Sequence, residues 1–356
     1  MGHAMSPLPL AWTVAVVLAM GSCGVLRHID YDVDPGVSAS FNPTQLAASV
    51  AYAKTFCSVL AAEFAQGGWG PCGDYLRIPP PAPRPEPLDD IPTEWTLLRL
   101  GGFGAQCLAP KVTTFEDAAK HLGHVHHIRS HHVDLGGFES SEQNADRILA
   151  FVRKLPEPKR LIVIAHSKGA ADVMVALQQY PQELRSIEAV ITIAGAVGGS
   201  YLVDRLQRLN DQVLQKLDLP CDPPESFRMA NAIDSMRRGN RQKFLAEHNP
   251  PEHVLGYSIS AVSTRDRTSK ILHGFWAHIS FYAKEHDTHI VERESILPWG
   301  TFLGRALGDH WAVAMPFDPN PKVSDRARRV IDQNKFPREA LVEAAVRTAI
   351  DDLRRR

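Results

Sequence analysis

A serine near the middle of the chain has the surroundings of a catalytic nucleophile. The run Leu161–Ala165 is apolar and rich in branched residues, as in a buried strand, and Val173–Leu177 continues in a helical pattern. Ser167 lies between them, with Ala165 two residues before it and Gly169 two residues after it. Small residues at both positions allow a turn so sharp that the hydroxyl projects from the end of the sheet. A hydroxyl in that position is suited to attack on a carbonyl carbon.

The five residues Ala165–Gly169 resemble the nucleophile elbow of the α/β-hydrolase superfamily, in the Ala-His-Ser-x-Gly form found in bacterial lipases. A simpler alternative is an ordinary strand, turn and helix in which Ser167 only caps the helix. A Ser–Lys mechanism that uses Lys168 is disfavoured, because such enzymes use other spacings and this lysine begins a helix with its side chain directed away from the serine.

A serine hydroxyl needs a base to take its proton, and that base is usually a histidine oriented by a buried carboxylate. In α/β-hydrolases the acid and then the histidine follow the serine along the chain. Seven histidines follow Ser167, and His310 lies in a loop that leads to the C-terminal helix, the expected place for the base. Asp287, 23 residues before His310, is the candidate acid. Asp266, which two arginines flank, is the competing candidate.

The surroundings of this acid and this base strengthen the resemblance. Bacterial lipases and esterases place the acid in an Asn-Asp-Gly-x-Val stretch, and the histidine follows about twenty residues later. The stretch Glu285–Val291 and the pair Asp309-His310 are similar. His286 and Thr288 stand where the lipases have Asn and Gly, which leaves the spacing intact.

The resemblance also implies two backbone donors for the negative charge that develops on the substrate oxygen. The N–H of Lys168 is one, because it begins a helix directly after the serine. The other is the N–H of Phe103, in the loop Gly101–Gly104, which is similar to the His-Gly-x-Gly loop of the family. The alternative for this loop is an ordinary flexible turn.

These matches imply a serine hydrolase that cleaves carboxylic esters, of small molecules or lipids, through an acyl-enzyme and without a cofactor. An acyltransferase or polyester depolymerase with the same triad, and a non-catalytic binding protein of the same fold, remain alternatives. Many Gram-negative lipases bind calcium through an Asp two residues after the catalytic histidine. Ala312 occupies that position here, so no calcium site is predicted.

Strands alternate with helices from residue 95 onward, which predicts an α/β-hydrolase domain over 95–356 with a mostly parallel sheet covered by helices on both faces. Residues 200–251 have helical spacing and no strand, which predicts a helical lid over the carboxyl ends of the strands. A helical extension and a proline-rich connector fill 24–94. The expected strands are 95–100, 161–165, 189–194 and 253–261, with 124–132 extended, and the expected helices include 42–64, 114–122, 142–155 and 338–354.

The N-terminal residues 1–23 are typical of a secretory signal. Leu8–Met20 is apolar apart from one Thr, and small residues precede Cys23, as in bacterial lipoprotein signals in which that cysteine is lipidated. We therefore expect an exported protein, periplasmic, secreted or attached to the outer membrane through Cys23. Cys57, Cys72, Cys107 and Cys221 then remain and permit two disulfides. A local bond between Cys57 and Cys72 is the simplest pairing.

The composition is that of a globular protein. The 356 residues are 44% hydrophobic with a formal net charge of −1, which excludes bulk nucleic-acid binding. The histidine-rich stretch His121–His132 raises the question of a metal, but no acid nearby in the sequence completes a ligand set, so no metal site is predicted. The basic cluster Arg237, Arg238 and Arg241 is interpreted as a solvated face of the lid.

Overall fold

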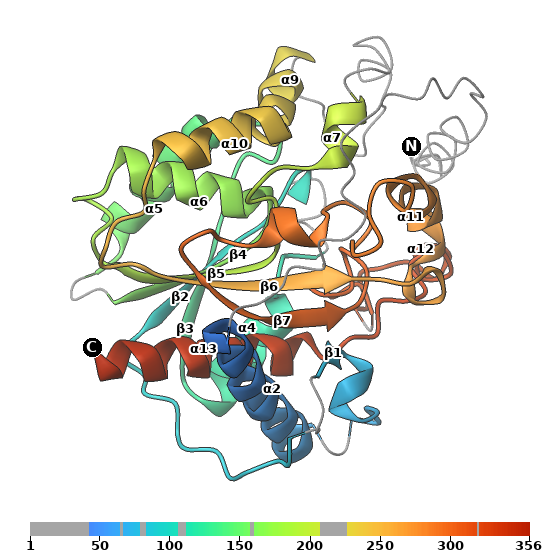
Figure 1. Cartoon of the computed structure of the whole chain (residues 1–356). Helices are drawn as coiled ribbons and strands as arrows, with labels where there is room; N and C mark the ends of the chain where they lie inside the picture. The colour runs from blue at the N-terminus through green and yellow to red at the C-terminus, as the bar shows by residue number, and fades with distance from the viewer. Residues whose placement is uncertain are drawn as a thin grey trace, which may run out of the picture.

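A twisted seven-stranded sheet forms the centre of the molecule (Figure 1). The computed structural model describes residues 43–64, 67–78, 83–105, 112–156, 160–206, 226–318 and 320–356. The strand order is β1-β7-β6-β5-β4-β2-β3, with β1 antiparallel to β7 and all other neighbours parallel. The strands are β1 (Leu76–Arg77), β2 (Thr96–Leu100), β3 (Arg129–Val133), β4 (Leu161–Ser167), β5 (Ile187–Gly195), β6 (Leu255–Val262) and β7 (Thr301–Leu307).

Helices cover both faces of this sheet, as predicted. The long helices α2 (Pro43–Glu63) and α13 (Arg338–Arg355) pack together with α4 (Glu116–Val125) on one face, and α5 (Ser141–Lys154) and α6 (Lys168–Gln179) cover the other (Figure 1). The remaining α-helices of the described residues are α7 (Tyr201–Leu206), α9 (Ser226–Ser235), α10 (Arg238–Glu247), α11 (His273–Ile279) and α12 (Asp325–Arg328).

The central strand β4 carries the elbow, and every one of its residues is buried. Its sequence is apolar without alternation, because helices cover both faces and no side of the strand meets water. The helix α5 before it begins with a capping box, in which Ser140 and Gln143 satisfy each other's backbone N–H groups. The junction between β4 and α6 lies between two buried segments, the whole of β4 and the first ten residues of α6.

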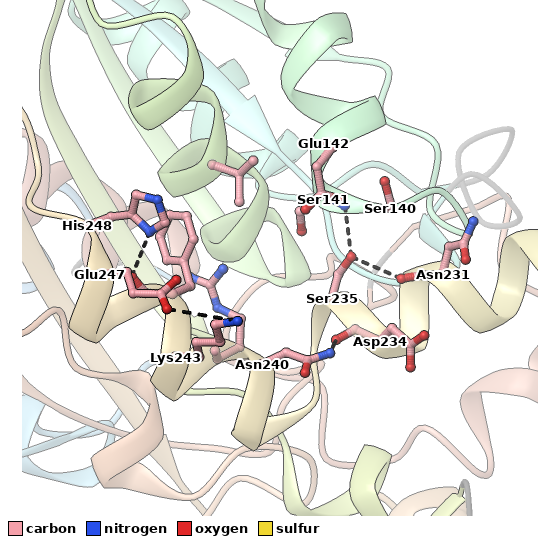
Figure 2. A pocket seen from close by; sticks show the side chains of 13 residues that line it. Ser140, Ser141, Glu142, Asn231, Asp234, Ser235, Asn240, Lys243, Glu247 and His248 are labelled. Carbon is pink, nitrogen blue, oxygen red and sulfur yellow. Dashed lines mark hydrogen bonds and ion pairs between the residues drawn. The ribbon is translucent and has the colours of Figure 1, made fainter.

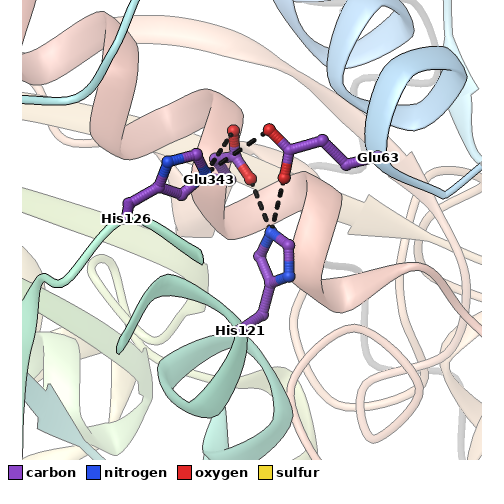
Figure 3. Close-up of side chains that lie close together, drawn as sticks. All are labelled: Glu63, His121, His126 and Glu343. Carbon is purple, nitrogen blue, oxygen red and sulfur yellow. Dashed lines mark hydrogen bonds and ion pairs between the residues drawn. The ribbon is translucent and has the colours of Figure 1, made fainter. Parts of the chain in front are cut away.

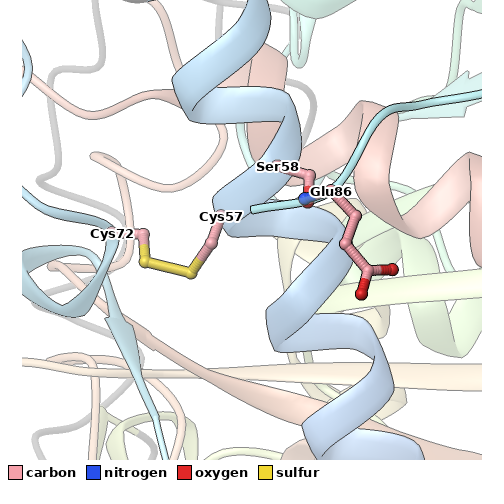
Figure 4. Close-up of a disulfide and its surroundings, with 4 residues drawn as sticks. All are labelled: Cys57, Ser58, Cys72 and Glu86. Carbon is pink, nitrogen blue, oxygen red and sulfur yellow. A yellow bond between two sulfur atoms is a disulfide. The ribbon is translucent and has the colours of Figure 1, made fainter. Parts of the chain in front are cut away.

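The N-terminal segment belongs to the same core as the hydrolase domain. Tyr52 of α2 is fully buried, and its hydroxyl donates a hydrogen bond to the Leu341 carbonyl of α13 at 3.0 Å. A disulfide joins Cys57 of α2 to Cys72, in the short turn that leads into β1 (Figure 4). The predicted pairing of these two cysteines is thus confirmed.

The described part of the predicted lid is helical, in α7, α9 and α10. The interpretation of its basic cluster as a solvated face is wrong for Arg241, which is only 3% exposed. Arg241 lies between α10 and α6, where it donates a hydrogen bond to the Val197 carbonyl at 3.0 Å and contacts the sulfur of Met174. Arg238 forms an ion pair with Glu294 at 3.0 Å. These arginines attach α10 to the body of the protein.

Two further details differ from the sequence expectations. His124 was expected in an extended segment but lies in α4, because the buried side chains Ala118 and Leu122 continue a helical face. The strand β7 was not foreseen. Its sequence contains Gly304 and Arg305, and its pairing with β6 shifts by one residue just before Gly304, so no regular alternation marks it.

Several expectations concern residues that lie outside the described ranges. These include the signal at 1–23 with Cys23, the cysteines Cys107 and Cys221, and the lid residues 207–225. Export and lipid attachment therefore stay predictions. Among the helices that are described, none has the length and apolar character needed to span a membrane.

We predict that replacing both Cys57 and Cys72 with serine lowers the free energy of unfolding by about 2–4 kcal/mol, because the bond closes a loop of 15 residues and limits the unfolded chain. Urea denaturation of oxidised wild type and variant measures the difference. Wild type in excess reductant should fall to the stability of the variant. Equal stability of the oxidised wild type and the variant would contradict the prediction.

Candidate active site

Ser167 lies at the junction of β4 and α6. Its backbone has φ 54° and ψ −127°, a conformation that residues other than glycine rarely adopt. Its side chain makes no capping hydrogen bond, so the alternative in which it serves only as a helix cap does not account for it. Gly169 has to be glycine, because a Cβ there would lie 2.6 Å from the Gly101 carbonyl oxygen. The elbow stores strain that the buried surroundings maintain.

His310 and Asp287 are in direct contact. The Nδ1–H of His310 donates a hydrogen bond to Oδ2 of Asp287 at 2.7 Å, and the His310 backbone N–H donates to the Asp287 carbonyl at 2.8 Å. The other carboxylate oxygen, Oδ1, accepts from the backbone N–H groups of His289 and Ile290 at 2.8 and 2.7 Å. Both oxygens of this fully buried carboxylate therefore accept hydrogen bonds. The bond to Oδ2 occupies Nδ1 of His310, so Nε2 is the ring nitrogen that takes no part in the contact with Asp287.

Asp266, the competing acid, is exposed on the surface turn Arg265–Arg267. A hydrogen bond from the Thr264 side chain lowers its pKa. The structure therefore brings Asp287 and not Asp266 to His310.

Asp309 fixes the loop that carries His310, a role that the sequence did not reveal. Its Oδ1 accepts from the backbone N–H groups of Trp311 and Ala312 at 3.0 and 2.8 Å, and Oδ2 accepts from that of Ser269 at 2.8 Å. This is the cap that an Asp provides at the start of a helical turn. In the sequence, the only signal for this role is that Asp309 directly precedes His310.

Two further imidazoles enclose the ring of His310, and no sequence motif indicates a role for either. The ring of His289 stacks on it with centroids 4.4 Å apart, and the ring of His166 lies 4.4 Å away at a tilt. The Nε2–H of His166 donates to the His310 carbonyl at 3.0 Å. Since His166 directly precedes Ser167, this bond ties the loop of His310 to the elbow.

Burial controls the charge of these groups. It lowers the pKa of His310 to about 3 and lowers the pKa of His166 and His289 well below the ordinary value. Burial also raises the pKa of the Asp287 carboxyl, which the His289 ring and the N–H groups of Ile290 and His289 counteract. All three imidazoles are therefore neutral at neutral pH, and His310 is in the form that accepts a proton.

The loop after β2 lies against the serine. A Cβ on Gly102 would fall 2.6 Å from Cβ of Ser167, so only glycine permits this approach. Phe103 follows at the surface, 38% exposed, with its ring edge-on to that of Phe138 at 5.1 Å. Lys168 is the first residue of α6, where helix N–H groups have no partner within the helix. The loop and the helix start therefore both approach Ser167.

The side chain of Lys168 serves a different purpose. It is fully buried, and its ammonium contacts Oδ1 of Asp172 at 2.6 Å. Asp172 also accepts from the Ser141 hydroxyl at 2.7 Å and the Asn144 amide at 2.8 Å, both on α5. The ammonium of Lys168 thus pairs with Asp172, which in turn joins α6 to α5. As expected, it is not directed at the serine.

A cavity of about 470 Å³ lies between α9, α10 and the start of α5 (Figure 2). Its walls combine polar side chains, among them Glu142, Asn240 and Lys243, with the apolar side chains Val175 and Phe244. Ser167 and His310 are not among the residues that line it, so it is separate from the site.

No protein-family profile matches the sequence, and no curated protein is significantly similar to it. Among solved structures, the metagenomic carboxyl esterase MGS0156 is similar over 95% of this chain and 99% of its own, with 31% identity and a TM-score of 0.77. The Bacillus licheniformis lipase BlEst2 in its propeptide form is similar over 63% of this chain and 48% of its own, with 18% identity and a TM-score of 0.50, which supports the fold alone. The chain therefore belongs to the carboxyl esterases of the α/β-hydrolase superfamily.

Proposed function

We propose that this protein hydrolyses carboxylic esters through an acyl-enzyme on Ser167. One observation carries the proposal. A neutral, buried His310 is held by the carboxylate of Asp287 and tied through His166 to a strained serine elbow. Neither a structural serine nor a binding protein needs this combination of strain and buried imidazole. The similarity to a carboxyl esterase supports the ester as the substrate class.

The reaction follows from these groups. The hydroxyl of Ser167 attacks the ester carbonyl carbon while its proton passes to Nε2 of His310. Asp287 keeps the imidazole in the tautomer with Nδ1 protonated and stabilises the imidazolium that forms. The N–H groups of Phe103 and Lys168 hold the developing oxyanion. His310 then protonates the leaving alcohol, and a water molecule activated by the same imidazole hydrolyses the acyl-enzyme.

The choice of acid gives a first prediction. Asp287→Ala should lower kcat for p-nitrophenyl butyrate by about 10³–10⁴-fold, because His310 loses the partner that fixes its tautomer. Asp266→Ala is the matched control and should stay within about twofold of wild type, because Asp266 lies on the surface. A large loss in the control, with an active Asp287→Ala, would overturn the assignment.

The strained serine gives a second prediction. Ser167→Ala and Ser167→Gly should both lose activity by at least about 10⁴-fold and should not react with a fluorophosphonate probe. The two variants should differ in stability. Glycine tolerates φ 54° and alanine does not, so Ser167→Gly should exceed Ser167→Ala in free energy of unfolding by about 1 kcal/mol. Urea denaturation measures this difference, and a less stable glycine variant would argue against a strained elbow.

The burial of His310 gives a third prediction. Neutral imidazole is the active form, so activity is lost as the pH falls through the pKa of His310. Because burial lowers that pKa, the acid limb of kcat/KM should lie below pH 6.5, the ordinary pKa of histidine. A pH profile with an uncharged ester measures it. A midpoint at or above pH 6.5 would show that burial does not control the base.

A further inference from the structure

Four metal-binding side chains meet on the face of the sheet away from α5 and α6. Glu63 is the last residue of α2, His121 lies on α4, His126 directly follows α4, and Glu343 lies on α13 (Figure 3). They come from three helices that are far apart in the sequence. One nitrogen or oxygen from each lies within 4.8 Å of the corresponding atom of every other member. We call these four residues the Glu–His cluster.

The distances within the cluster are not those of a complete hydrogen-bond network. Nε2 of His121 lies 2.8 Å from a carboxylate oxygen of Glu63 and 2.8 Å from one of Glu343, although a ring nitrogen carries at most one hydrogen. Nε2 of His126 is directed at the same two carboxylates from 3.4 and 3.2 Å.

One buried atom of the cluster, Nε2 of His126, has no hydrogen-bond partner among the described residues, although its side chain is only 10% exposed. It faces the carboxylates of Glu63 and Glu343 (Figure 3). Buried polar atoms without partners are rare in folded proteins, and a bound ion is one of the explanations for them. Oε2 of Glu63 lies 2.8 Å from Nε2 of His121, the nitrogen that Glu343 also approaches.

Two carboxylates of the cluster lie side by side, and one of them, Glu343, is fully buried. Arg347 lies next to both, with its Nε donating to Oε1 of Glu343 at 2.7 Å and its Nη2 3.6 Å from Oε1 of Glu63. The bond from Arg347 fixes the orientation of the Glu343 carboxylate and leaves Oε2 directed at Nε2 of His121.

We propose that the Glu–His cluster binds one divalent transition-metal ion, and that zinc is the ion it fits. Two imidazole nitrogens and two carboxylate oxygens form a closed set of four, which is the number that structural zinc sites use. Bonds of about 2.0–2.2 Å place tetrahedral ligand atoms about 3.3–3.6 Å apart, so a small expansion of the 2.8–3.4 Å contacts admits the ion. Two nitrogen ligands disfavour calcium and magnesium, which prefer oxygen.

The position of the cluster assigns the ion a structural task. His126 lies three residues before β3 begins, at the amino-terminal edge of the sheet. Ser167 lies at the carboxyl end of β4, at the opposite edge. The ion does not touch the substrate. It joins α2, α4 and α13, the three helices of one layer.

The test uses the full protein, stripped of metal with dipicolinic acid and then incubated with zinc sulfate. After removal of free zinc, elemental analysis should find one zinc per chain in wild type and in His124→Gln, an exposed histidine of the same helix. His126→Gln and Glu343→Gln should bind zinc more than about 100-fold more weakly. Zinc should raise the Tm of wild type by at least about 5 °C and leave that of His126→Gln unchanged.

Cobalt provides a second readout that does not depend on activity. Titration of the stripped wild type with Co²⁺ should give the intense visible absorption of a tetrahedral site, and His126→Gln should lack it. If His126→Gln is unfolded by circular dichroism, Glu63→Gln carries the same comparison. The imidazoles and carboxylate of the active site also lie close enough to bind a metal, so His310→Ala is included.

The outcomes separate clearly. Zinc retained in His310→Ala and lost in His126→Gln supports the proposal. Zinc lost in His310→Ala and retained in His126→Gln overturns it, and so does a wild type that binds less than about a tenth of an equivalent. The esterase proposal is unaffected in either case, because its own test is the loss of ester hydrolysis in Ser167→Ala.

Discussion

The structure of the site depends on how closely the backbone of the loop after β2 approaches Ser167. The loop after β2 passes directly against the serine, and a Cβ on Gly102 would collide with it. Gly169 allows α6 to begin against the Gly101 carbonyl, which fixes the direction of the first N–H groups of the helix. This close approach requires the strained φ of Ser167. Nucleophile, loop and helix start can meet at one point only because no side chain separates them.

The residues of this site could be proposed from the sequence because their signals are local. The elbow needs small residues at fixed positions, and the acid and base each lie in short stretches whose order along the chain is characteristic. The contact of Asp287 with His310 therefore agrees with expectation. The contacts of Asp309, His166 and His289 could not be predicted from the sequence. No local pattern distinguishes these residues, and their roles come from contacts between different loops.

The Glu–His cluster could not be found from the sequence. The stretch around His121 lacked an acid nearby, and no metal site was predicted for that reason. The acids come from the first and last long helices, 58 residues before and 222 residues after His121, so no spacing rule relates them. Arg241 was misjudged for the same reason, since only the packing of α10 on α6 buries it. The strand β7 was not predicted because Gly304 and the register shift beside it interrupt the alternation of apolar and polar residues.

The pairing of α2 with β7 and α13 has a consequence for the order of folding. The Ser49 hydroxyl of α2 donates to the Phe302 carbonyl of β7, and Tyr52 of the same helix donates to α13. In the order of synthesis, α2 precedes both β7 and α13 by most of the described chain. These contacts can therefore form only after α13 has been made, and a chain truncated before α13 leaves Tyr52 without the surface that buries it.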